Sequence, residues 1–96
     1  IWGLVGSAYN DWGATPDALF TRDWSQPNDN IWVLNKVTLL DGEYKFRSNE
    51  AWALNYGDTG ADGTLDDGGD NIISVAGTYS FVLDFTDPDN PTYTIN

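Results

Sequence analysis

Apolar and polar positions along the chain follow the pattern of short β-strands separated by turns. Residues 78–85 show it most clearly, because Tyr79, Phe81, Leu83 and Phe85 occupy every second position. Side chains of a strand point alternately to its two faces, so this strand is predicted to bury one face. Comparable patterns predict further strands at residues 1–5, 31–40, 43–48, 52–56, 71–75 and 92–95, the last with Tyr93 and Ile95 facing inward.

About seven strands without a helical pattern predict an all-β fold, an antiparallel β-sandwich of the immunoglobulin-like or carbohydrate-binding-module type. The Asp41-Gly42 turn predicts a hairpin between residues 31–40 and 43–48. Residues 9–30, including the turn-forming Asn28-Asp29-Asn30, are predicted to form a loop. Residues 57–70 form a second predicted loop, which contains five glycines and five aspartates.

Length and composition restrict the domain organisation and the chemistry. Ninety-six residues fit a single domain, 1–96. The chain opens directly on a predicted strand, so we expect a domain excised from a longer chain. It contains no cysteine and no histidine, which excludes serine–histidine and cysteine–histidine catalysis within the chain. The net charge of −11 disfavours nucleic acid and anionic lipid as partners. No apolar run is long enough for a membrane helix, so no insertion into a membrane by this domain is expected.

One predicted strand carries two of the chain's four cations beside aromatic residues. Alternation places Tyr44 and Phe46 on the core face, and Lys45 and Arg47 on the other, where we expect them to face solvent. Trp52, Asn55 and Tyr56 follow closely along the chain. Flat aromatic rings beside hydrogen-bond donors suit a sugar, whose C–H faces stack on rings while its hydroxyls need partners. The alternative interpretation is a surface strand with a few solubilising charges.

Four further tryptophans differ in their surroundings. Trp12 lies beside Gly13 in a polar loop, which favours stacking on a ligand over a role as a lid on the core. Trp24 is expected to cap the core together with Phe20. Trp2 and Trp32 lie within predicted strands and are expected to be structural.

The acidic loop contains a partial calcium-binding pattern. Asp58, Asp62 and Asp66 fall at positions one, five and nine of an EF-hand loop, but Gly60 and Gly69 replace the ligands expected at positions three and twelve. The pattern therefore favours a solvated acidic turn. A calcium-stabilised domain would require the three aspartates to converge. No metal site and no cofactor are otherwise predicted.

The sequence does not identify a pair of carboxylates that could catalyse glycoside hydrolysis. Fifteen acidic residues would place some pair at a suitable separation by chance, and nothing identifies a desolvated general acid. We therefore expect a protein that is not an enzyme.

Several short segments, spread over nearly the whole chain, form a recognisable set. They are Tyr44-Lys45-Phe46-Arg47, Trp52-Ala53-Leu54-Asn55-Tyr56-Gly57-Asp58, the stretch from Leu65 to Asn71, the closing Gly77-Thr78-Tyr79 with Leu83-Asp84, Tyr93 and Ile95, and the opening Leu4-Val5-Gly6 with Trp12. Together they resemble the SusE/SusF-like starch-binding domains of Bacteroidetes outer-membrane lipoproteins. The opening is also similar to that of starch-binding modules attached to amylolytic enzymes.

The resemblance implies a non-catalytic sandwich that holds oligosaccharide or polysaccharide, with α-glucan favoured. It implies an aromatic platform of Trp12 and Trp52, with Lys45 and Arg47 as donors and Asn55 and Tyr56 behind them. It also implies a place at the cell surface and outer membrane on a lipid-anchored chain, beside other domains of that chain and an outer-membrane uptake complex. The alternative is a structural spacer domain of a surface lipoprotein, with no ligand of its own.

Overall fold

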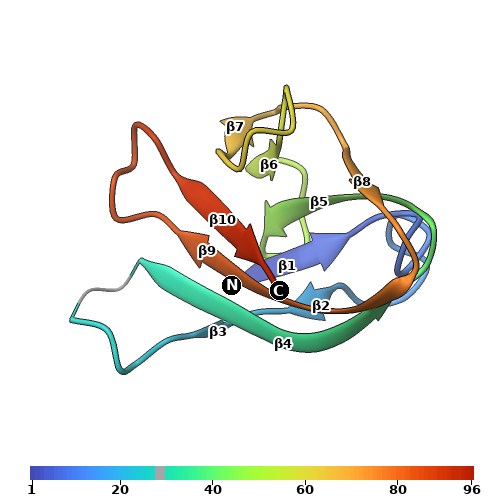
Figure 1. The fold of residues 1–96 in the computed structure, drawn as a ribbon, viewed down its shortest axis with the longest axis horizontal. Coiled ribbons are helices and arrows are strands. Elements are labelled where there is room, and N and C mark those ends of the chain that lie inside the picture. The colour runs from blue at the N-terminus through green and yellow to red at the C-terminus, as the bar shows by residue number, and fades with distance from the viewer. Residues whose placement is uncertain (28–29) are drawn as a thin grey trace.

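The chain forms an antiparallel β-sandwich, described here by a computed structural model for residues 1–27 and 30–96 (Figure 1). In those residues it has ten strands: β1 Trp2–Val5, β2 Ala18–Leu19, β3 Thr21–Arg22, β4 Ile31–Leu39, β5 Gly42–Ser48, β6 Asn55–Gly57, β7 Asp66–Asp67, β8 Ile72–Ser74, β9 Gly77–Asp84 and β10 Thr92–Ile95. The predicted all-β sandwich is confirmed, with more strands than the seven expected. No helix in the described ranges could cross a membrane.

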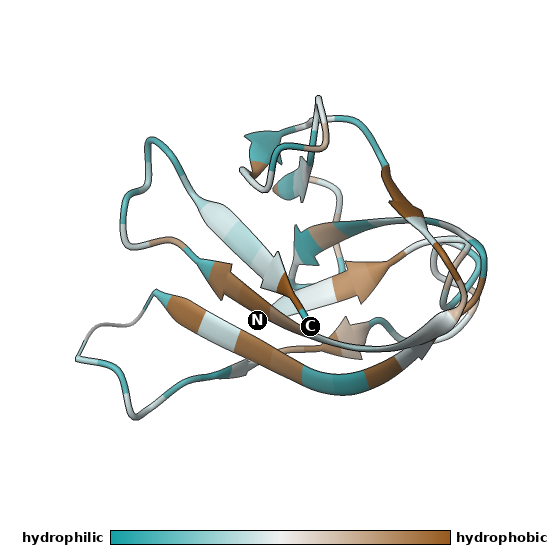
Figure 2. Cartoon of the chain, viewed as in Figure 1, coloured by the Kyte–Doolittle hydropathy of each residue, from teal (hydrophilic) through white to brown (hydrophobic). Residues whose placement is uncertain are grey.

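Two sheets make up the sandwich. The first runs β2-β1-β5-β6-β7, with β8 added to the start of β5, and the second runs β10-β9-β4-β3. The longest pairing joins β4 to β9, interrupted by a bulge between Leu34 and Val37. Hydrophobic residues concentrate on β1, β4, β8 and β9, whereas the connecting loops are largely hydrophilic (Figure 2).

Aromatic rings fill the space between the sheets. Phe46 of β5 is fully buried at the centre, and its ring lies 5.7 Å from each of Phe20, Tyr44 and Tyr93 and 5.8 Å from Phe81. Such edge-to-face and tilted contacts add to the burial of apolar area. The predicted inward face of β9 is confirmed, since Phe81 and Leu83 are fully buried.

The predicted hairpin between residues 31–40 and 43–48 is wrong. β4 pairs with β9 and β3, whereas β5 pairs with β1, β6 and β8, so the chain crosses between the sheets at Asp41-Gly42. Asp41 accepts a hydrogen bond from the backbone of Ala76. Gly42 has a φ of 154° and lies against Ser7, so the turn is fixed by contacts outside the two strands.

Smaller differences concern the ends of elements and the loops. Ile95 pairs with the fully buried Phe81 and so lies on the inward face as predicted, but it is 46% exposed because it lies near the end of the edge strand β10. The strand predicted at residues 52–56 begins only at Asn55. The predicted loops contain the short strands β2, β3 and β7. Asn28 and Asp29 of the predicted turn lie outside the described residues.

Candidate functional site

Trp12 and Trp52 lie side by side on the outer side of the first sheet. Their ring centroids are 6.0 Å apart with the planes tilted by 41°. Trp52 is 46% exposed and Trp12 is half-buried. Trp12 comes from the turns that follow β1, and Trp52 from the turn between β5 and β6. The two predicted platform residues are thus neighbours, although forty positions of sequence separate them.

The backbone around this pair adopts unusual conformations. Asp11, Trp12, Asn49 and Glu50 have φ angles between 51° and 62°, and they are four of the six non-glycine residues with positive φ in the described chain. Such conformations cost on the order of 1 kcal/mol each for ordinary residues and tend to cluster at functional sites. Local hydrogen bonds hold both turns, including those from the Gly13 and Ala51 amides. The two tryptophans therefore lie on turns whose shape is set by the protein's own hydrogen bonds and does not depend on a ligand.

Arg47 lies beneath the aromatic pair and does not face solvent as predicted. Its Nε and Nη2 donate to the two carboxylate oxygens of Asp17 at 2.6 and 2.8 Å, and only 7% of the residue is exposed. The guanidinium carbon lies 4.7 Å from the centre of the Trp52 ring, within the range of a cation–π contact. The hydrogen bonding that Arg47 donates to Asp17 raises the pKa of Arg47. Arg47 thus supports Trp52 from below.

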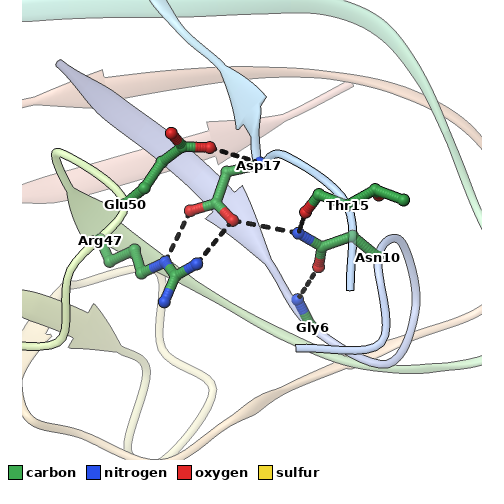
Figure 3. Close-up of polar contacts among 6 residues, drawn as sticks. All are labelled: Gly6, Asn10, Thr15, Asp17, Arg47 and Glu50. Atoms are coloured by element: carbon green, nitrogen blue, oxygen red, sulfur yellow. Dashed lines mark hydrogen bonds and ion pairs between the residues drawn. The ribbon is translucent and has the colours of Figure 1, made fainter. Parts of the chain in front are cut away.

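A buried polar network surrounds Asp17 (Figure 3). The side-chain Nδ2 of Asn10 donates to the Asp17 carboxylate at 3.0 Å and to the Thr15 backbone carbonyl at 2.9 Å. The side-chain Oδ1 of Asn10 accepts from the Gly6 amide. The Asp17 amide in turn donates to Glu50 at 2.8 Å. The network therefore joins the turn that carries Trp12 to the turn that precedes Trp52.

Nothing in the sequence indicated this network. Asp17 is one carboxylate among fifteen and lies thirty positions from Arg47. Asn10 occurs in the Tyr9-Asn10-Asp11-Trp12 segment, but nothing in that segment marks its side chain as buried. Only the folded positions of the two turns bring these groups together.

Lys45 is also buried, contrary to the prediction that it faces solvent. Its Nζ donates to Asn55 Oδ1 at 2.6 Å, and Asn55 Nδ2 donates to the Trp52 carbonyl at 3.0 Å. Burial lowers the pKa of Lys45, and the charges of Asp70 and Asp67 partly oppose this effect. Lys45 and Asn55 therefore fix the far end of the Trp52 turn.

Tyr56 lies on the other face of the sheet, away from the aromatic pair. Its ring contacts Trp2 and Phe85, each at a centroid distance of 5.6 Å. Asn55 and Tyr56 are consecutive residues of β6 and so point to opposite faces. Tyr56 is partly buried and packs against the core, and Trp2, stacked 4.6 Å from Phe85, is structural as predicted.

Trp24 does not cap the core. It is 77% exposed, and the Arg22 guanidinium lies 3.8 Å from the centre of its ring. Phe20 alone fills the predicted core position, with 2% of its surface exposed. Trp32 packs against the core, as expected for a strand residue.

Asp58, Asp62 and Asp66, here called the acidic cluster, converge as a calcium-stabilised domain would require. A carboxylate oxygen from each lies within 4.8 Å of the others. All three already accept hydrogen bonds. Asp58 accepts from Tyr93 at 2.6 Å and from two backbone amides, while Asp62 accepts from Thr64 and Asp66 from the Thr59 amide. These bonds account for the shape of the loop.

Two mainly apolar cavities lie between β8 and β10, away from the tryptophan pair. Their volumes are about 160 and 280 Å³, and Tyr44, Ile73 and Ile95 line both. No feature of the sequence singled out this region as a site. The hydroxyl of Ser74, at the wall of the smaller cavity, is buried without a hydrogen-bond partner.

Comparison of the sequence with protein-family models and with curated proteins finds no match.

Proposed function

We propose that this protein is a non-catalytic glycan-binding domain, and that the Trp12–Trp52 pair forms its binding surface. The observation that carries the proposal is the placement of two neighbouring indole rings, one of them half exposed, on turns fixed by buried polar contacts. A spacer domain would not need this pairing. Tilted rings side by side offer a curved apolar surface to successive sugar units.

The proposed ligand is a starch-like α-glucan. The 41° tilt between the rings suits the curvature of a helical glucan better than a flat ribbon-like chain. Arg47 uses Nε and Nη2 to bind Asp17, so Nη1 is the guanidinium nitrogen left for a sugar hydroxyl. In this proposal the two tryptophans stack on the sugar. Arg47, Lys45 and Asn55 hold Trp52 and its turn in place. Tyr56 has no role at this surface.

Binding through so few contacts is expected to be weak. Stacking contacts and neutral hydrogen bonds contribute about 0.5–1.5 kcal/mol each, before the cost of ordering the ligand. Three or four of them correspond to dissociation constants of roughly high micromolar to millimolar. Several such domains on one polypeptide would together hold a polysaccharide much more tightly than one domain does. This fits the setting that the SusE/SusF-like resemblance implies, a lipid-anchored chain that captures polysaccharide for an uptake complex at the outer membrane.

The test is a titration with maltoheptaose and, in parallel, with a β-glucan oligosaccharide, followed by tryptophan fluorescence. We expect saturation with the α-glucan and its loss in a folded Trp52→Ala variant. Trp24→Ala is the matched control, because Trp24 is an exposed tryptophan over an arginine but lies outside the pair. A folded Trp52→Ala variant with unchanged affinity would refute the assignment.

The second candidate function is a structural spacer without a ligand. The internal pairing of Lys45 and Arg47 favours it, because both predicted sugar-binding cations are occupied by protein groups. It predicts no saturable response to any glycan. It also predicts that Trp52→Ala changes only stability.

A further inference from the structure

The four cations of the chain are all placed so that the tryptophan pair gains little positive charge. Arg22 lies over Trp24, and Lys36 lies in β4 of the other sheet. Lys45 binds Asn55, and the carboxylates of Asp67 and Asp70 act on it. Arg47 alone contacts the pair, and its charge is opposed by both oxygens of a buried carboxylate.

We infer that Asp17 is a specificity-determining residue of the Trp12–Trp52 surface, which neutralises Arg47 and thereby restricts the surface to uncharged sugars. This inference rests on the proposed glycan binding. Uronic-acid and sulfated sugars carry charges that an unpaired arginine would attract. With the arginine paired, that attraction is removed before a ligand arrives.

The surrounding charges act in the same direction. Asp11 is adjacent to Trp12 and exposed, and Glu50 lies two positions before Trp52. With the Asp17–Arg47 pair close to neutral, these two carboxylates leave the surface negative. An anionic sugar would meet repulsion, whereas a neutral sugar would be little affected.

The Asp17–Arg47 pair is also shielded from solvent. The Asp17 side chain is fully buried and that of Arg47 is 8% exposed, so salt screens their interaction poorly. Asn10 adds a further hydrogen bond to the carboxylate. The network therefore holds Asp17 against Arg47 instead of leaving it free to rotate away when a ligand binds.

The first measurement uses the unaltered protein. Maltoheptaose and an α-linked oligogalacturonate of the same length are titrated under matched conditions. We expect saturation with maltoheptaose alone, at an affinity that does not change between about 0.02 and 0.5 M salt. If neither ligand binds, the proposed function fails. If maltoheptaose binds and the oligogalacturonate binds as tightly, only the inference about Asp17 fails.

The second measurement uses Asp17→Asn, which keeps the shape of the side chain and removes its charge. We expect oligogalacturonate affinity to rise about fivefold at low salt and to fall again as salt is added. A loss of stability alone would weaken the binding of both ligands and could not produce a gain for the anionic ligand only. An equal loss of affinity for both ligands in the folded variant would overturn the inference.

Two control variants isolate the effect. Asp11→Asn removes an exposed carboxylate beside Trp12 without unpairing Arg47, and we expect less than about a twofold gain for the anionic ligand. The double variant Asp17→Asn/Arg47→Gln should lose the gain, because no arginine charge is then released. Persistence of the gain in the double variant would show that Arg47 is not its source.

Discussion

Replacement of Phe46 by alanine should be among the most damaging changes to this fold. The side chain is fully buried and its ring contacts four other aromatic rings at 5.7–5.8 Å. Removal of a buried phenylalanine ring costs about 3–5 kcal/mol, and the loss of four ring contacts places Phe46 at the upper end of that range. For a domain whose total stability is on the order of 5–15 kcal/mol, this loss is a large fraction.

The assay is urea unfolding followed by tryptophan fluorescence. With a slope of about 1.5 kcal/mol per molar urea, a loss of about 4.5 kcal/mol lowers the midpoint by about 3 M. Phe85→Ala is the matched control, because Phe85 contacts two rings and is only half-buried. We expect that change to cost about 2 kcal/mol. If Phe46→Ala does not fold, Phe46→Leu should still do so, at a cost of about 1–1.5 kcal/mol.

Two results would refute the reasoning. Equal losses for Phe46→Ala and Phe85→Ala would show that ring contacts and burial do not rank these positions. A loss below about 2 kcal/mol for Phe46→Ala, with the slope unchanged, would show that the sandwich does not depend on this central ring.

Three further predictions concern pH, backbone packing and calcium. Burial raises the pKa of Tyr44 and of Tyr93, so the folded state keeps their protons longer than the unfolded chain does. The stability they contribute is therefore present below pH of about 10 and lost as pH rises further, and Tyr44→Phe should flatten this alkaline loss in urea midpoints measured across the pH series. Gly6→Ala should abolish folding or lower the melting temperature severely, because its Cβ would overlap the backbone carbonyl oxygen of Glu43 in β5. Gly68→Ala, at a φ of 64° with open space around it, should cost only about 1 kcal/mol, and equal effects would contradict this account. The acidic cluster already accepts several hydrogen bonds, so we expect the same melting temperature in calcium and in chelator, and a clear rise with calcium would show a metal site.

The fold class follows from the sequence because alternation is a local property. β9 and β5 were predicted from their own residues, and the inward faces of both are as expected. The pairing of strands is not local. An Asp-Gly turn permits a hairpin, but whether its flanking strands pair depends on which other strands compete for the same edges. Here β4 pairs with β9 on one edge and with β3 on the other.

The candidate site was predictable in part for the same reason. Alternation placed Lys45 and Arg47 together on the face opposite the core, but it could not show that Asp17 and Asn55 cover them. The residues 9–17 fold over that face through turns with positive φ, which the sequence does not mark. Tyr56 was assigned to the site by its proximity along the chain, although its position next to Asn55 in a strand requires the opposite face.

The crossing of the chain between the sheets at Asp41-Gly42 has a consequence for the rate of folding. Because β4 and β5 do not form a hairpin, their main partners are distant, with Ile31 opposite Asp84 and Trp2 opposite Ser48. Long loops must close before these pairings form, and proteins dominated by such contacts fold in milliseconds to seconds. During synthesis, the apolar strand β4 leaves the ribosome well before its partner β9 has been made. The domain is therefore most vulnerable to association with other chains while it is being synthesised, before β9 has emerged.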